Sequence, residues 1–454
     1  MSGPQELTGE INSKDDLIRF ISDGAKPKAD WRIGTEHEKF GFDKETLKPL
    51  PYDGPCSIKA MLEGLQRFGW KGEFEGDNII ALTDGKGASV SLEPGGQFEL
   101  SGAPLETLHQ TCGEVSTHIQ QVKEVAEEIG AGFLGVGAQP IWTVDDTPMM
   151  PKGRYKIMRN YMPTVGSHGL EMMFTTCTVQ VNLDFGSEAD MVKKLRVSLA
   201  LQPLAAALFA TSPFSEGKPN GFKSWRSEIW RDTDPARSGM LPQAFEDGFG
   251  YEAYIDYALD VPMYFVYRNG NYIDCAGQSF RTFLDGGLPA LPGEKPNMSD
   301  WANHMTTIFP EARVKQFIEM RGADGGPWAR LCALPAFWVG LLYDQSALDA
   351  AWDLVKDWTD EDRQSLRDQV PKLALNADLN GTSLQEIAGR VLEISEAGLR
   401  ARNKLNSSGD NEVMFLNVLS EMVSSGQTLA DVMLENYAGE WGGDITRIYS
   451  DYVY

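Results

Sequence analysis

Positive charge is scarce in this sequence. Its 454 residues include 41 Lys and Arg against 65 Asp and Glu, which gives a formal net charge of −24. Nucleic acids and anionic membranes bind surfaces rich in Lys and Arg, so neither kind of partner is expected. An acidic, solvated surface is the simplest interpretation of this composition. Small anionic substrates stay compatible with it, provided that a local group of arginines binds them.

Targeting and membrane signals are also missing. The first sixteen residues are polar, without the basic region and apolar run of a secretory signal or the Arg-rich pattern of a transit peptide. The most apolar later stretch, 197–210, is too short to cross a bilayer and is broken by Pro203, so it is expected to be a buried helix. We therefore expect a cytosolic protein.

Several common catalytic motifs are absent. The five cysteines form no C-x-x-C pair, and the five histidines are scattered without metal-binding spacing. The sequence contains no G-x-S-x-G element, no Walker lysine loop and no H-E-x-x-H motif. These absences argue against a zinc site, an α/β-hydrolase nucleophile and a P-loop nucleotide site.

The patterns that are present predict an α+β fold. Alternating residues predict strands, whereas helical spacing dominates after Pro327. We expect an antiparallel or mixed sheet with helices on one side in a region 1–342, and a helical region 343–454 packed on the same domain. The expected strands are 31–42, three strands within 79–101, 177–185, 262–268, 271–275 and 316–321. The expected C-terminal helices are 337–348, 350–359, 361–370, 383–398, 412–425 and 428–438.

Two carboxylates lie two residues apart in the predicted strand 31–42. Glu36 and Glu38 therefore point to one face, while His37 points away. Burying both carboxylates without a countercharge is costly. Mg²⁺ supplies such a countercharge, and it prefers oxygen ligands. Taken alone, the pair is better explained as an exposed strand face, where neighbouring carboxylates cost little.

Three further segments repeat this arrangement of polar residues. Pro94-Gly95-Gly96 is expected to kink a strand and to let the backbone approach a ligand closely. Several strands with paired polar groups favour the lining of a cleft over a solvated sheet face. The pairs are Glu93 and Glu99 around the Pro-Gly-Gly segment, Gln180 and Asn182, and Glu319 and Arg321.

Arginines supply the opposite charge. A guanidinium group can bind a carboxylate or a phosphate through two parallel hydrogen bonds, so arginines beside glycines and aromatic residues suit anionic substrates. Each of these residues is equally compatible with a surface ion pair. The candidates are Arg154, Arg159, Arg226, Arg231, Arg237, Arg321 and Arg330.

Together these motifs resemble the plant-type glutamate–cysteine ligases, a family shared by plants and some bacteria. The resemblance is strong from about residue 30 to about residue 345 and weaker beyond. The segments that carry it are RIGTEHEKFGF, GGQFELSGAPLETLHQTC, MPKGRYKIMRNYMP, TCTVQVNLDF, PNGFKSWRSEIWRDTDPARSGMLP, DYALDVPMYFVYRNGNYIDC and IEMRGADGGPWARLCALPAFWVGLLYD.

The resemblance implies a glutamine-synthetase-like fold, in which a curved antiparallel sheet surrounded by helices forms the floor of a metal-lined site. It implies that ATP phosphorylates the γ-carboxylate of L-glutamate, and that the amine of L-cysteine then attacks the γ-glutamyl phosphate. The product is γ-glutamylcysteine, in the first step of glutathione biosynthesis. Two or three Mg²⁺ ions would neutralise the phosphates during the transfer. The enzyme is expected to be a monomer or a homodimer.

The resemblance also assigns residues. Arg321 would stabilise the transferring phosphoryl group and contact ATP, and Arg330 would be a second ATP contact. Gln180 stands where related ligases have a histidine, which leaves its contact with the metal open. The implied metal ligands are Glu36, Glu38, Glu93, Glu99, Gln180 and Glu319. The implied substrate-binding residues are Arg154, Arg226, Tyr264, Thr176 and Thr178.

The plant members of this family carry two regulatory disulfides. Cys112 and Cys332 match one of these pairs. Cys275 matches half of the other, but Ala290 occupies the position of its partner. The resemblance therefore implies one disulfide and excludes the second.

Two alternatives to this ligase stay open. The first is a related carboxylate–amine ligase that joins glutamate to a different amine. The second is a regulatory protein that binds a metal or nucleotide on a degenerate scaffold. A degenerate scaffold is expected to lack at least one of the metal-binding carboxylates, whereas every carboxylate that the motif requires is present.

Overall fold

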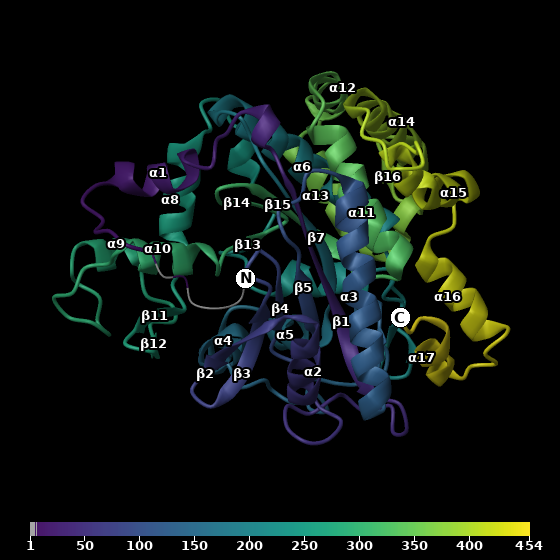
Figure 1. Cartoon of the computed structure of the whole chain (residues 1–454). Helices are drawn as coiled ribbons and strands as arrows, with labels where there is room; N and C mark the ends of the chain where they lie inside the picture. The colour runs from purple at the N-terminus through teal and green to yellow at the C-terminus, as the bar shows by residue number, and fades with distance from the viewer. Residues whose placement is uncertain (1–4, 6) are drawn as a thin grey trace.

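The computed structural model describes residue 5 and residues 7–454, and one antiparallel sheet organises this part of the chain (Figure 1). Its strands are β1 (Ile33–Asp43), β2 (Lys71–Glu75), β3 (Asn78–Thr83), β4 (Ser89–Leu92), β5 (Phe98–Ser101), β6 (Ala131–Leu134), β7 (Thr178–Leu183), β14 (Ala312–Val314) and β15 (Ile318–Asp324). The strand order is β14-β15-β7-β1-β5-β4-β3-β2, and β6 pairs with the second half of β1. Residues 1–4 and 6 of the predicted region 1–342 lie outside the described residues.

The register of the sheet separates a polar face from an apolar one. Glu36 lies opposite Gln180 on one side and Ser101 on the other, and Glu38 lies opposite Glu99. Side chains alternate between the two faces of a strand, so these partners share the polar face. The intervening residues, such as Val179, are buried in the core. The predicted period-two pattern is thus the reason that the acidic side chains meet.

Helices cover the apolar face. The long α3 (Leu108–Ile129), α6 (Glu188–Leu208) and α11 (Trp328–Leu342) contact β6, β15 and β7, respectively (Figure 1). Their apolar side chains and those of the sheet form the main core. The polar face is instead approached by α4 (Gly153–Tyr161), α5 (Gly169–Thr175) and α7 (Trp225–Ile229).

The remaining elements surround this framework. The C-terminal helices gather at one side of the molecule, opposite the hairpin of β11 and β12 (Figure 1). The other helices are α1 (Lys14–Ser22), α2 (Ile58–Leu65), α8 (Tyr251–Asp260), α9 (Phe280–Leu284), α10 (Met298–Met305), α12 (Gln345–Val355), α13 (Asp360–Leu373), α14 (Leu384–Arg402), α15 (Asn417–Ser425), α16 (Leu429–Ala438) and α17 (Ile448–Asp451). The short strands are β8 (Phe214–Ser215), β9 (Lys218–Pro219), β10 (Ser238–Gly239), β11 (Phe265–Arg268), β12 (Asn271–Asp274), β13 (Phe309–Pro310), β16 (Asp378–Leu379) and β17 (Thr382–Ser383).

The predicted α+β fold with a large antiparallel sheet is confirmed, but two local predictions are wrong. Pro94-Gly95-Gly96 does not kink a strand; it forms the turn between β4 and β5, where Gly96 N donates to Glu93 O at 2.9 Å and Gly96 has a φ of 82°. The predicted helix 337–348 is in fact interrupted at Asp344, whose carboxylate accepts hydrogen bonds from Ser346 N and Ala347 N and so begins α12.

Among the described residues, no single helix is both long enough and apolar enough to cross a membrane. Only α11 and α12 taken together have the necessary length and apolar composition, and the chain bends by 90° between them.

Candidate active site

One pocket lies over the polar face of the sheet, and acidic and basic side chains both line it. Strands β1, β5, β7, β14 and β15 form its floor, and α4, α5 and α7 contribute to its walls. The charged residues of its lining are Glu36, Glu38, Glu93, Glu99, Arg154, Arg226, Arg313 and Arg321. Gln180, Thr176 and Thr178 also line it. The structure therefore brings most of the predicted site residues together.

Polar neighbours hold three of the carboxylates in place. Asn182 Nδ2 donates to Glu36 Oε1 at 2.8 Å, and Ser101 Oγ donates to Glu99 Oε1 at 3.1 Å. The backbone N–H of Thr178 donates to Glu38 Oε2 at 3.0 Å. These bonds come from β5 and β7, the strands that flank β1, so the sheet itself orients the acidic groups.

Burial and neighbouring carboxylates disfavour the ionised forms of Glu38 and Glu99. Burial raises the pKa of Glu38 well above its ordinary value, and the charges of Glu93 and Glu99 raise it further. Burial and the neighbouring Glu36 raise the pKa of Glu99 to about 8. The charge of Arg226 lowers the pKa of Glu38 but does not offset burial, so a cation bound beside these groups would favour their ionised forms. Even so, no three His, Cys, Asp or Glu side chains in the described part of the chain stand in ready-made metal-binding geometry.

Glu319 differs from the other predicted metal ligands. It is fully buried, and Arg313, Lys315 and Arg321 surround its carboxylate with N–O distances of 2.7, 3.3 and 2.5 Å. Burial alone would raise its pKa, but these three charges outweigh burial and hold the pKa well below the usual value. Glu319 is absent from the pocket lining and serves, as it stands, as the counterion of a basic group.

Arg226 of α7 contacts Arg321 at the middle of β15. Arg321 Nη1 donates to Gln180 Oε1 at 2.9 Å, and Arg226 Nη2 donates to the carbonyl oxygen of Arg321 at 3.0 Å. The Nε of Arg226 is buried without a hydrogen-bond partner among the described residues. A buried, unused guanidinium donor suits an anionic ligand.

Sequence reasoning missed two basic residues here. Arg313 lines the pocket from β14, and Lys315 follows it two residues later. Their spacing in EARVKQF is a signal of a shared strand face. This signal is weak, because β14 has only three residues and its apolar pattern is too short to predict a strand.

Besides Glu319, two predicted residues are not brought to the pocket. Tyr264 is buried beside it: its hydroxyl contacts Met162 Sδ at 3.4 Å, and the Arg237 guanidinium lies 3.8 Å from its ring centre. Arg330 lies on α11, which covers the apolar face, and its guanidinium is 4.0 Å from Met422 Sδ. The prediction that Arg330 contacts ATP in this pocket is therefore not supported, because the helix carries this side chain to the opposite side of the sheet.

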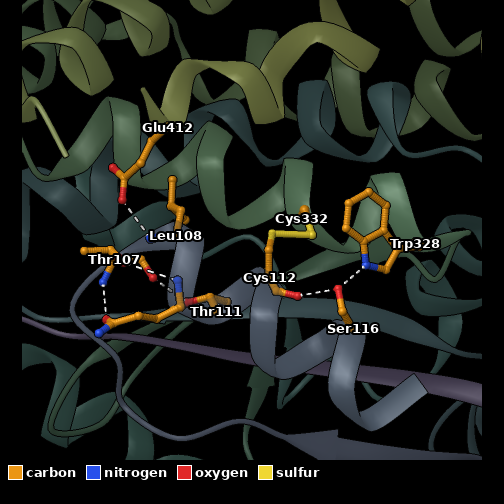
Figure 2. Close-up of a disulfide and its surroundings, with 9 residues drawn as sticks. Thr107, Leu108, Thr111, Cys112, Ser116, Trp328, Cys332 and Glu412 are labelled. Carbon is orange, nitrogen blue, oxygen red and sulfur yellow. Dashed lines mark hydrogen bonds between the residues drawn. A yellow bond between two sulfur atoms is a disulfide. The ribbon is translucent and has the colours of Figure 1, made fainter. Parts of the chain in front are cut away.

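A disulfide joins Cys112 of α3 to Cys332 of α11 on the apolar side of the sheet (Figure 2). Their Cα atoms are 5.6 Å apart, within the usual range for a disulfide. Nearby, Trp328 Nε1 donates to Ser116 Oγ at 2.9 Å, which ties the same two helices together (Figure 2). Cys275 is a free, buried cysteine.

Replacing Cys112 by Ser is expected to lower the thermal stability of the oxidised protein. The disulfide closes a loop across a sequence separation of 220 residues, and such cross-links typically contribute about 2–4 kcal/mol. Thermal unfolding with and without dithiothreitol measures the effect. The reductant should destabilise the unsubstituted protein and the Cys275→Ser control but leave Cys112→Ser unchanged. Equal responses in all three proteins would contradict the assignment.

Comparison with known proteins covers nearly the whole chain. The family model for glutamate-cysteine ligase family 2 matches residues 32–451. The chain is 59% identical over 443 residues to the chloroplastic glutamate–cysteine ligase of Brassica juncea, covering 97% of this chain and 84% of that protein. It is 58% identical over 449 residues to the chloroplastic enzyme of Nicotiana tabacum, covering 99% of this chain and 84% of that protein.

A solved structure shows the same fold at low sequence identity. The glutamate–cysteine ligase of Francisella tularensis, crystallised in complex with AMP, matches with a TM-score of 0.57 and 13% identity. The match covers 93% of this chain and 89% of that one.

These comparisons also correct one expectation. The sequence led us to expect a cytosolic enzyme, but relatives with 58–59% identity are chloroplastic, so the prediction of a cytosolic location is contradicted. The prediction of the family itself is confirmed: the chain belongs to glutamate–cysteine ligase family 2.

Proposed function

We propose that this glutamate–cysteine ligase uses ATP and Mg²⁺ to activate glutamate in the pocket over the polar face of the sheet. The γ-carboxylate oxygen of L-glutamate attacks the γ-phosphorus of ATP, and ADP leaves. The amine of L-cysteine then attacks the resulting acyl phosphate, loses a proton and displaces phosphate. The observation that carries this proposal is that one pocket is lined both by four glutamates and by four arginines.

The glutamates suit Mg²⁺. Glu36, Glu38, Glu93 and Glu99 offer oxygen ligands, and a bound cation would offset the burial and the neighbouring carboxylates that raise the pKa of Glu38 and Glu99. Gln180 Oε1 accepts one hydrogen bond from Arg321, which leaves its second lone pair for a metal. Bound Mg²⁺ would neutralise the charge that moves with the phosphoryl group. This fit supports a metal site at the acidic side of the pocket.

The arginines suit the anionic substrates. Arg321, in the middle of β15, lines the pocket and donates to Gln180 and Glu319, so its charge can stabilise the transferring phosphoryl group. Arg313 also lines the pocket and can bind the phosphates of ATP, and Lys315 adds positive charge beside Glu319. Arg226 and Arg154 lie on the side of α7 and α4, where they can bind the carboxylates of the amino acids. Thr176 and Thr178 line the pocket beside them.

Purified protein should release ADP only when ATP, Mg²⁺, glutamate and an amine acceptor are all present. Cysteine should stimulate release, whereas alanine and glycine should stimulate it far less; mass spectrometry should detect γ-glutamylcysteine. Stimulation by another amine but not by cysteine would favour the alternative ligase. Full activity after Mg²⁺ removal with EDTA would contradict the metal site.

A further inference from the structure

A buried carboxylate behind the pocket has no role in the chemistry proposed above. Asp324 is the last residue of β15, three positions after Arg321, and none of its surface is exposed. An ionised group costs several kcal/mol to bury unless polar partners compensate it. Its partners therefore indicate why this position holds an aspartate.

Three donors from two separate segments converge on this carboxylate. Asp324 Oδ2 accepts from Thr211 N at 3.0 Å and from Ser212 Oγ at 2.6 Å. Its Oδ1 accepts from Ser224 Oγ at 2.7 Å. The fit is close, because a Cβ at Gly137 would come within 2.3 Å of Asp324 Cγ. The aspartate thus fixes the segment after α6 and the residue that precedes α7.

The same two serines hold Arg226. Ser224 is the N-cap of α7 and accepts from Ser227 N at 3.1 Å. Ser212 Oγ, which donates to Asp324, accepts from the backbone N–H of Arg226 at 3.2 Å. The guanidinium of Arg226 reaches back to the Arg321 carbonyl oxygen on the same strand as Asp324. β15 therefore holds both the backbone of Arg226, through Ser212 and Asp324, and its side chain, through the Arg321 carbonyl oxygen.

We infer that Asp324 is a positioning residue that holds Arg226, through Ser212 and Ser224, in the orientation that binds the carboxylate of an amino-acid substrate. The inference rests on the proposed function of Arg226. Substrate binding would then depend on a residue outside the pocket, because Asp324 itself does not reach the pocket. Both carboxylate oxygens of Asp324 accept hydrogen bonds, whereas the amide of asparagine has only one oxygen that can accept them.

Steady-state kinetics of the full chain test the inference. Asp324→Asn should raise the KM for one amino-acid substrate about tenfold, while the KM for ATP and kcat change less than about threefold. Ser224→Ala, which keeps the buried charge and its two other donors, should shift the same KM in the same direction by a smaller factor. Asp300→Asn is the matched control, since Asp300 is also buried but binds Arg268 outside the pocket. It should lower the melting temperature without changing any KM.

A double-substitution cycle separates positioning from general stability. In an Arg226→Ala background, adding Asp324→Asn should change the KM by less than about twofold, because the group that it positions is gone. If the full effect of Asp324→Asn persists in that background, or if every KM stays unchanged in the single variant, the inference is wrong.

Hydrogen exchange gives a readout that needs no turnover. Asp324→Asn should speed exchange in 224–229, which includes the N–H groups of Arg226 and Ser227, while Asp300→Asn should not. Failure of the proposed function would show as an unsubstituted protein without cysteine-stimulated ADP release. In that case, unchanged exchange in 224–229 of Asp324→Asn would overturn the positioning role of Asp324. Faster exchange would support that role, with Arg226 binding a different anion.

Discussion

Glu38→Gln is expected to lower kcat by about three orders of magnitude while making the metal-free protein more stable. Glutamine keeps the size of the side chain and still accepts the hydrogen bond from Thr178 N. It cannot supply the charge that Mg²⁺ requires, and loss of one group that stabilises developing charge costs about 10²–10³ in rate even without loss of the metal. The measurement is ADP release at saturating substrates.

The expected gain in stability follows from the direction of the pKa shift. Burial and the charges of Glu93 and Glu99 raise the folded-state pKa of Glu38 above the unfolded value. The contribution of Glu38 to stability is therefore fully present below the ordinary glutamate pKa of about 4.3 and is lost as the pH rises toward the folded value. Gln cannot ionise, so its advantage should grow above about pH 5 and vanish near about pH 4.

Thermal unfolding in EDTA at several pH values measures this advantage. Glu73→Gln, at an exposed position of β2, is the control and should leave both activity and melting temperature near those of the unsubstituted protein. Added Mg²⁺ should stabilise the unsubstituted protein more than Glu38→Gln. If Glu38→Gln retains turnover, Glu38 is not a metal ligand. A lower melting temperature at pH 8 would contradict the proposed repulsion.

The acidic half of the site could be predicted from local sequence, because it depends on the alternation of side chains along a single strand. A period of two in a strand places Glu36 and Glu38 on one face whatever the rest of the chain does. Their encounter with Glu99 depends on pairing of β1 with β5, which the alternating pattern suggests but does not require. The family resemblance implied that they meet, because it placed Glu36, Glu38 and Glu99 among the metal ligands.

The basic half depends on tertiary packing and was predicted less well. Arg330 follows Arg321 by only nine residues, yet the Gly325-Gly326 turn sends it into α11 on the other face of the sheet. Arg313 reaches the pocket because three-residue β14 pairs with β15, which places Arg313 opposite Glu319. No local periodicity distinguishes these outcomes, so sequence spacing alone could not tell a pocket arginine from a buried one.

This contrast leads to the second large effect, which is expected at Arg321. Arg321→Lys should lower kcat about 10²–10³-fold, because lysine keeps the charge but cannot bind Gln180, Glu319 and a phosphoryl oxygen at once. Glu319 would also lose one of its three cationic partners, so part of any change in stability should come from that buried carboxylate. Comparison of the melting temperature with kcat separates the two effects.

Arg330→Lys is the matched control, since it makes the same substitution in an arginine that is also largely buried but lies on the far side of the sheet. It should keep kcat and the KM for ATP within about threefold of the unsubstituted values, even if it lowers stability. An Arg330→Lys variant that loses ATP affinity as strongly as Arg321→Lys loses kcat would restore the ATP contact predicted from the sequence. That result would mean that the first turn of α11 lies against the nucleotide. Near-normal activity in Arg321→Lys would instead move the transferring phosphoryl group toward Arg313 and Lys315, the other cations that Glu319 holds together.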